Sequence, residues 1–196
     1  MAGDCTRGTI FHMPYGWEGD KVRLVPLDKA KHMDNALAWI NDPGITAWTL
    51  VGDWPLTRLA EEEFFERQMR QTETDLTFAV ETLDRGEHIG FSGLHRIDWK
   101  NGVATTGTML GRRDLWGKGY GSDAARVRTR HAFEVLGLRL LLSEVMADNA
   151  GSIRMLEKAG YREVGRIPRR LWKRGAFRDV VILALERDGL TADRSS

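Results

Sequence analysis

The feature that most restricts how this chain can fold is a glycine turn placed directly before a helix. Glycine occupies three alternate positions in the segment Gly117-Lys118-Gly119-Tyr120-Gly121-Ser122. Glycine has no Cβ, so it adopts positive φ and lets a ligand approach the main chain closely. The first amides of the following helix lack internal partners and lie at the positive end of the helix dipole. The turn therefore predicts a cradle for a phosphate or pyrophosphate.

Two common phosphate-binding templates do not fit this turn. A dinucleotide fingerprint needs G-x-G-x-x-G, but here Gly121 comes one residue too early. A P-loop needs G-x-x-x-x-G-K-[ST], but here Lys118 precedes Gly119. A glycine turn alone is equally consistent with a tight connection between two elements. The elements around it must therefore distinguish this interpretation from a phosphate cradle.

The first third of the chain has the pattern of one strand followed by two helices. Asp28 is a candidate cap for the first helix, and Asp42-Pro43-Gly44 should end it. In order, we expect a strand over Val22–Leu27, a helix over about 29–41, a tryptophan-bearing loop over 45–55 and a helix from Thr57 to about Gln71.

After residue 75 the apolar period changes to that of strands. Strands are expected over Leu76–Glu81, His88–Asp98 and Val103–Leu110, and Asn101-Gly102 predicts a hairpin between the last two. In the second of these strands, alternation places four side chains on one face: Ile89, Phe91, His95 and Ile97.

From Gly117 onward the order is helix, strand, helix, strand, which is a crossover pattern that permits a parallel pair. The elements are the helix after the turn, a strand at Leu138–Met146, a helix at about 150–159 and a buried strand at Val180–Leu185. The sequence thus predicts an α+β domain on a mostly antiparallel sheet, and not a doubly wound one.

Length and composition indicate a single domain over residues 21–187, with an N-terminal arm at 1–20 and a polar tail at 188–196. A net charge of +1 argues against bulk nucleic acid as a partner. The single cysteine, Cys5, excludes an internal disulfide, and its position near the terminus argues against a metal site. The chain shows neither a membrane-length apolar run nor a secretory signal pattern, so we expect a cytoplasmic protein.

Two motifs at a fixed separation resemble the GNAT superfamily of acyl-CoA N-acyltransferases. The family turn, Q/R-x-x-G-x-G/A, is matched by the segment from Trp116 to Gly121, with tryptophan at the Q/R position. The family block N-x-x-S, followed by EK-x-G-F/Y, is matched by Asn149 to Tyr161. The resemblance covers about Val22 to Leu185 and looks closest to the branch of Rim-type ribosomal-protein N-terminal acetyltransferases and their small-molecule relatives.

This resemblance implies acetyl-CoA as co-substrate. In the family, the fourth and fifth strands splay apart, the pantetheine arm pairs with main-chain groups between them, and the glycine turn holds the pyrophosphate. Asn149 is implied to contact the arm, although asparagine is also an ordinary helix N-cap. The coenzyme-binding residues implied here are Met109, Leu110, Trp116, Gly117, Lys118, Gly119, Tyr120, Gly121, Ser122 and Asn149.

The resemblance also suggests a general acid. Many members carry a tyrosine where this chain has Leu156, which cannot donate a proton. In the Rim-like branch a serine is proposed to protonate the leaving thiolate, and Ser152 matches that position. The alternative is that Ser152 only bonds its own helix end.

Three residues are candidates for a general base. Glu144 is the one carboxylate in an apolar strand, where burial would raise its pKa; the alternative is a structural pair with an arginine among Arg126, Arg128 and Arg130. His95 lies within a strand beside the expected cleft and is a candidate base through a water, or a plain core residue. Asp98, just after His95, is the third candidate. The resembled branch often carries a glutamate near Thr105, and threonine cannot act as a base, so the resemblance does not select among the three.

The expected acceptor is a primary amine, either a protein N-terminal α-amine or a small amine. Trp48 and Trp54 are candidates for walls of its pocket, with core packing or a homodimer contact as alternatives. The basic segment Arg166–Arg178 suits an acidic substrate, the 3′-phosphate of the coenzyme, or plain solvation. The competing function is a non-catalytic acyl-CoA-binding or regulatory protein on the same scaffold.

Overall fold

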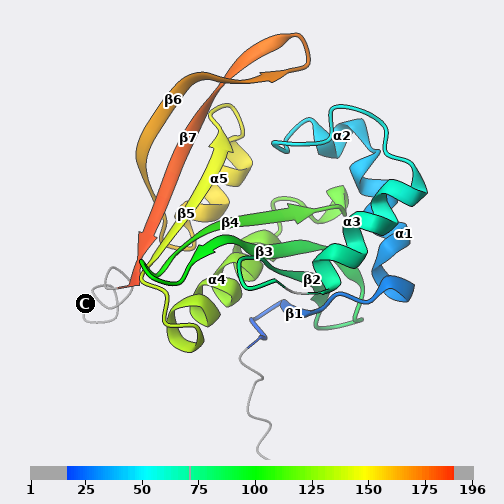
Figure 1. Ribbon diagram of the computed structural model, residues 1–196, viewed down its shortest axis with the longest axis horizontal. Coiled ribbons are helices and arrows are strands. Elements are labelled where there is room, and N and C mark those ends of the chain that lie inside the picture. The colour runs from blue at the N-terminus through cyan, green and yellow to red at the C-terminus, as the bar shows by residue number, and fades with distance from the viewer. Residues whose placement is uncertain (1–16, 71, 188–196) are drawn as a thin grey trace, which may run out of the picture.

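The structure is a computed structural model that describes residues 17–70 and 72–187 and is built on one seven-stranded sheet (Figure 1). Most of the expected N-terminal arm and all of the expected tail lie outside these residues. The elements in order are β1 (Val22–Pro26), α1 (Lys29–Ile40), α2 (Pro43–Thr46), α3 (Arg58–Met69), β2 (Leu76–Thr82), β3 (His88–Asp98), β4 (Val103–Leu110), η1 (Arg113–Leu115), α4 (Tyr120–Arg130), η2 (His131–Val135), β5 (Leu140–Met146), α5 (Ala150–Glu157), β6 (Arg162–Lys173) and β7 (Ala176–Glu186). No helix in the described part of the chain is long and apolar enough to cross a bilayer.

The strand order is β1-β2-β3-β4-β5-β7-β6, and every neighbouring pair is antiparallel except β4–β5. The predicted α+β class and the hairpin at Asn101-Gly102 are confirmed, with Gly102 at a φ of 63°. The parallel pair β4–β5 joins only Val103–Thr105 to Leu140–Leu142. Both strands continue past this point, so the sheet opens between them.

Helix caps largely follow the sequence. The side chains of Asp28 and Thr57 accept hydrogen bonds from the amides of Lys31 and Ala60, at 3.2 Å each. The expected loop after α1 was wrong in part: α1 ends at Ile40 with Asn41 as its C-cap, and Asp42 then caps the short helix α2, with Pro43 in its first turn. Proline suits that position because its missing N–H would be unpaired there in any case.

The expectation that four β3 side chains share one face is also wrong. Register shifts interrupt the strand near Ile89 and between His95 and Asp98, and Arg96 adopts a φ of 51°. Bulges of this kind reverse the alternation of side chains. Phe91 packs with Met33 and Phe65 below α1 and α3, whereas Ile89 belongs to the core cluster that includes Val127 of α4.

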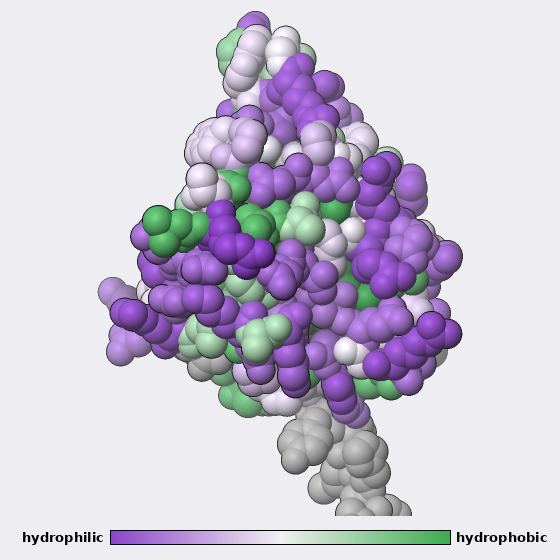
Figure 2. Space-filling model, turned by 90° about the vertical axis from the view of Figure 1, so that its right-hand side faces the viewer, coloured by the Kyte–Doolittle hydropathy of each residue, from purple (hydrophilic) through white to green (hydrophobic). Residues whose placement is uncertain are grey.

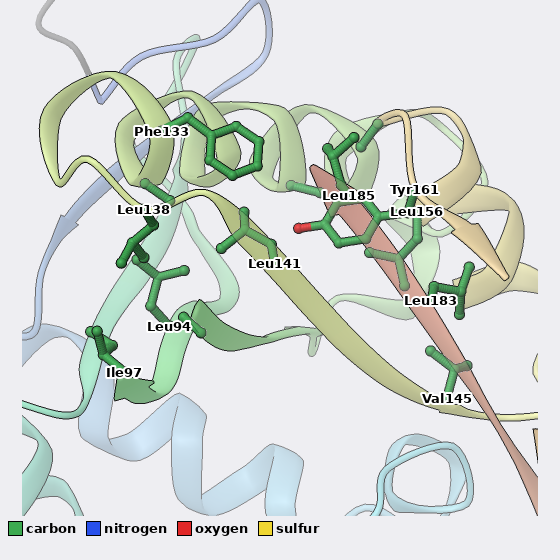
Figure 3. Packing of buried hydrophobic residues seen from close by; sticks show 14 of the residues in the cluster. Leu94, Ile97, Phe133, Leu138, Leu141, Val145, Leu156, Tyr161, Leu183 and Leu185 are labelled. Carbon is green, nitrogen blue, oxygen red and sulfur yellow. The ribbon is translucent and has the colours of Figure 1, made fainter. Parts of the chain in front are cut away.

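Helices cover both faces of the sheet (Figure 1). The α1 and α3 layer is thin: Phe65 is buried, but Phe64 and Met69 of the same helix are exposed. The larger core lies on the face of α4 and α5, where Phe133, Leu141 and Leu183 converge with Leu156 and Tyr161 (Figure 3).

A buried carboxylate ties the start of the sheet to α4. Asp123 accepts hydrogen bonds from the amides of Lys21 and Val22, at 2.8 and 3.0 Å, and from Arg126 at 3.0 Å. Burial alone would raise the pKa of Asp123, but these donors outweigh it and hold the pKa below its usual range. These hydrogen bonds hold β1 against the first turns of α4, next to the glycine turn.

Close contact between β3 and β4 requires glycine at position 90. A Cβ there would lie 2.1 Å from the carbonyl oxygen of Met109, a backbone atom that cannot rotate away. Overpacking commonly costs 1–3 kcal/mol and occasionally more, so Gly90→Ala should lower the free energy of unfolding by about 3 kcal/mol. Urea unfolding followed by circular dichroism measures this change. The control is Gly165→Ala in β6, where the nearest atom lies 4.0 Å away and little change is expected; equal stabilities of the two variants would contradict the argument.

Candidate active site

The glycine turn has the conformation that an anion cradle needs. Gly117 and Gly119 adopt φ values of 76° and 91°, and Gly119 is the N-cap of α4. No side chain caps this helix end within the described residues, so its first amides remain available to a ligand. Lys21, which the sequence did not indicate, lies alongside, with Nζ 5.3 Å from the ring centroid of Tyr120. The turn therefore offers main-chain donors and a nearby cation.

The gap between β4 and β5 begins immediately after their short parallel pairing. Side chains bridge its closed end: Thr106 Oγ1 donates to the Leu142 carbonyl at 3.2 Å, and Ser143 Oγ donates to the Thr106 carbonyl at 3.4 Å. Beyond them, the edge of β4 is free to pair with an extended ligand. Trp116 Nε1 donates to the Leu110 carbonyl at 2.9 Å, so that carbonyl already has one partner.

A cavity of about 720 Å³ opens at this gap. It lies between the α3 side of the sheet, the loop after α2 and the start of α5. Five of the predicted catalytic and coenzyme-binding residues line it together: His95, Met109, Glu144, Asn149 and Ser152. The glycine turn, with Leu110 and Trp116, does not line it. The structure thus separates the expected phosphate cradle from the expected reaction chamber.

His95 has a carboxylate partner that the sequence did not reveal. Its Nδ1 lies 3.2 Å from Asp75 Oδ1, and its ring packs against Gly93, where an added Cβ would lie 2.8 Å from Nε2. Burial lowers the pKa of His95; Asp75 opposes the shift, while the nearby charges of Arg128 and Arg96 add to it. The imidazole is therefore neutral at pH 7 and able to accept a proton.

Glu144 is half-buried, and its partner is Arg96 of β3, whose Nη2 lies 3.2 Å from Oε1. The alternative that an arginine of α4 pairs with it is wrong. Arg126 binds Asp123, Arg128 binds oxygens of β3 and β4, and Arg130 binds the Glu18 carbonyl.

Asp98 serves the β3–β4 turn. Its carboxylate accepts hydrogen bonds from the amide and the side chain of Asn101, at 3.0 and 2.6 Å. It is exposed and does not line the cavity, so the structure gives no support to its candidacy as a base.

Asn149 caps α5, as its sequence position allows. Its Oδ1 accepts the amide hydrogen of Ser152 at 3.0 Å, and its Nδ2 donates to the Trp48 carbonyl at 3.4 Å. Ser152 lies in the first turn of α5 and faces the cavity. Leu156, at the position where relatives carry tyrosine, is fully buried.

The loop after α2 closes one side of the cavity and is held there by the last two strands. Lys173, only 2% exposed, donates to Asp53 Oδ1 and to the Val51 carbonyl, at 2.8 Å each. Trp48 and Trp54 line the cavity while remaining 44% and 69% exposed.

The neighbouring α1 to α3 side of the molecule is mostly hydrophilic, with hydrophobic side chains gathered in separate patches (Figure 2).

The basic segment Arg166–Arg178 is largely engaged within the protein. Arg178 pairs with Asp148 at 2.8 Å, Arg166 pairs with Asp179, and the guanidinium of Arg169 lies 4.7 Å from the centre of the Phe177 ring. These contacts favour a structural role for the hairpin over the two ligand-binding alternatives.

The sequence analysis did not identify three residues of this site: Asp75, which pairs with His95, and Glu61 and Arg128, which line the cavity. Asp75 precedes a strand and carries no signal of its own. Glu61 lies in the first turn of α3, where an acidic residue is ordinary, but it is buried and lines the cavity, and burial raises its pKa. Arg128 could have been found, because Arg126 and Arg130 share a helix face and position 128 lies about 200° away from them.

Comparison with known proteins agrees with this geometry. The family model described as "Acetyltransferase (GNAT) domain" matches residues 21–162, so the chain belongs to the GNAT family and is an N-acetyltransferase of that family. It is 28% identical over 152 residues to "Uncharacterized N-acetyltransferase p20" of Bacillus licheniformis, covering 74% of this chain and 82% of that protein.

Solved structures extend the comparison. A GCN5-related N-acetyltransferase from Brucella melitensis has a TM-score of 0.73 and 27% identity, over 90% of this chain and 80% of that one. A spermidine N-acetyltransferase from Vibrio cholerae, solved with CoA and spermine, has a TM-score of 0.79 and 17% identity, over 87% and 98% of the two chains. The likeness to the spermidine N-acetyltransferase shows a shared fold. The family uses acetyl-CoA, and the positive-φ glycines before α4 and the free edge of β4 suit its pyrophosphate and its arm.

Proposed function

We propose that this protein transfers an acetyl group from acetyl-CoA to a primary amine by direct attack within a ternary complex. The observation that carries the proposal is the opening of the sheet between β4 and β5 beside the uncapped glycine end of α4. The amine nitrogen forms a bond to the thioester carbonyl carbon, and the carbon–sulfur bond breaks. The amine loses one proton, and the thiolate gains one. Positioning the reactants contributes most of the acceleration.

We assign the pyrophosphate to the amides around Gly117–Ser122 and the arm to the main chain near Met109. Ser152 is the proposed proton donor to the thiolate, because it faces the cavity from the first turn of α5. His95 is the proposed base, since it is held by Asp75 and is neutral at pH 7, whereas Glu144 is already paired with Arg96. Glu144 then has the role of positioning Arg96 at the cavity wall.

The acceptor is a protein N-terminal α-amine or a small amine. The resemblance to the Rim-type branch supports the first. The fold shared with a spermidine acetyltransferase supports the second only at the level of architecture. We also propose that the protein works in the cytoplasm, with a homodimer as its expected assembly.

Thiol release from acetyl-CoA tests the proposed reaction. The purified chain should release free CoA with at least one amine in a panel of short peptides, amino acids, polyamines and aminoglycosides. Ser152→Ala should slow that release by about 100-fold, the low end of the usual contribution of a general acid. If the protein binds CoA but releases none with any amine, it is a coenzyme-binding protein without this activity.

A further inference from the structure

Arg128 is a buried cation at the cavity wall. It is 1% exposed, whereas Arg126 of the same helix is exposed and Arg130 is half-buried. Its Nη1 donates to three uncharged oxygens: Ser92 Oγ at 3.1 Å, the Gly107 carbonyl at 2.8 Å and Thr108 Oγ1 at 2.7 Å. These bonds fix the guanidinium but leave its charge uncompensated.

The remaining two nitrogens of Arg128, Nε and Nη2, are buried and have no hydrogen-bond partner within the described parts of the chain. They form one edge of the planar guanidinium, with two parallel N–H donors. This edge is the one that binds a carboxylate in a bidentate manner. Burying a charge without a partner costs several kcal/mol, so such a donor pair points to an anion that arrives with a ligand.

The other charged residues of the cavity wall do not supply that anion. Asp53 pairs with Lys173, Glu144 with Arg96, and His95 with Asp75. No described carboxylate lies within ion-pairing distance of Arg128. Glu61 is a charged wall residue for whose carboxylate the described residues show no ion pair, and a carboxylate there suits the ammonium group that an amine substrate brings.

Arg128 lies close to the point where the sheet opens. Its Nη1 holds the Gly107 carbonyl, two residues beyond Thr105, where β4 and β5 separate. We infer that Arg128 binds a substrate carboxylate at this point, so the preferred substrate pair includes a carboxylate. This inference rests on the proposed function. The carboxylate has two possible carriers: the acceptor, as in an amino acid, or the acyl group, as in succinyl-CoA.

Binding measurements on the intact chain separate the two carriers. In one arm, calorimetry compares succinyl-CoA with acetyl-CoA. In the other, amino acids are titrated into the CoA-loaded protein and compared with their amides, which keep the amine and lose the anion. We expect at least a tenfold preference for the carboxylate in one arm. Arg128→Gln should abolish that preference while binding of the neutral analogue changes less than threefold.

Equal binding by the wild-type protein overturns the inference without any variant, and Arg128→Lys assigns an observed preference to Arg128 if Arg128→Gln does not fold. Arg128→Lys, which keeps the charge and loses the paired donors, should retain only part of the preference. Equal binding of carboxylate and neutral ligands in both arms overturns the inference, as does a preference that Arg128→Gln leaves intact. Failure of the proposed function is distinct, because it appears as absent thiol release whether or not carboxylates bind.

Discussion

Gly117→Asp is expected to weaken CoA binding by at least about 100-fold, or about 2.7 kcal/mol. The substitution places a carboxylate at the mouth of the proposed pyrophosphate cradle, where like charges repel. It also forces a side chain onto a backbone φ of 76°, which costs roughly 1–2 kcal/mol for a residue with a Cβ. Isothermal titration with CoA measures the change in affinity.

The chain offers a matched control for this substitution. Gly175, in the turn between β6 and β7, has a φ of 78°, and like Gly117 it has no atom within 4 Å of an added Cβ. Gly175→Asp therefore carries the same backbone strain and the same added charge at a remote site. We expect it to bind CoA as the wild type does. If Gly117→Asp also binds normally, the glycine turn is only a connection, and the proposed coenzyme site is wrong.

His95→Gln is expected to lower kcat by about 100-fold or more, the usual contribution of a general base, with little change in CoA affinity. The wild-type rate should fall as the pH drops through the pKa of His95, because the protonated imidazole cannot accept a proton. Burial places that pKa below its ordinary value, so the loss occurs in the acidic range. The pH–rate profile of His95→Gln should lack this acidic limb.

Asp75→Asn provides the companion test. Asp75 raises the pKa of His95 against the effect of burial, so its removal should shift the acidic limb to lower pH. It should also lower kcat less than His95→Gln does, because the imidazole remains. A His95→Gln variant that keeps more than a third of the wild-type kcat would exclude His95 as the base.

Features fixed by local chemistry were predictable from the sequence. Asp28, Thr57 and Asn149 cap helices because their side chains reach amides within three residues. The Asn101-Gly102 turn sets the β3–β4 hairpin, and the glycine turn sets the start of α4. Each depends on the preferences of a few adjacent residues, which a single sequence displays.

Features that depend on contacts between distant segments were not predictable. The pairing of His95 with Asp75 spans 20 residues, and that of Arg96 with Glu144 spans 48. The bulges in β3 also escaped prediction, because strict alternation fits the sequence equally well and only the register against β2 and β4 breaks it.

The sequence by itself determined the family, the glycine turn and the order of most strands and helices, because each is written in short motifs and apolar periods; α2 and the long strand β6 were not expected. Only the tertiary structure decided which charged side chains meet at the cavity. The sequence placed three arginines on α4, but packing of α4 against β3 and β4 buried Arg128 among neutral oxygens at the opening of the sheet. Whether a charged side chain has a partner depends on the fold, because the partners come from strands that are distant in the sequence.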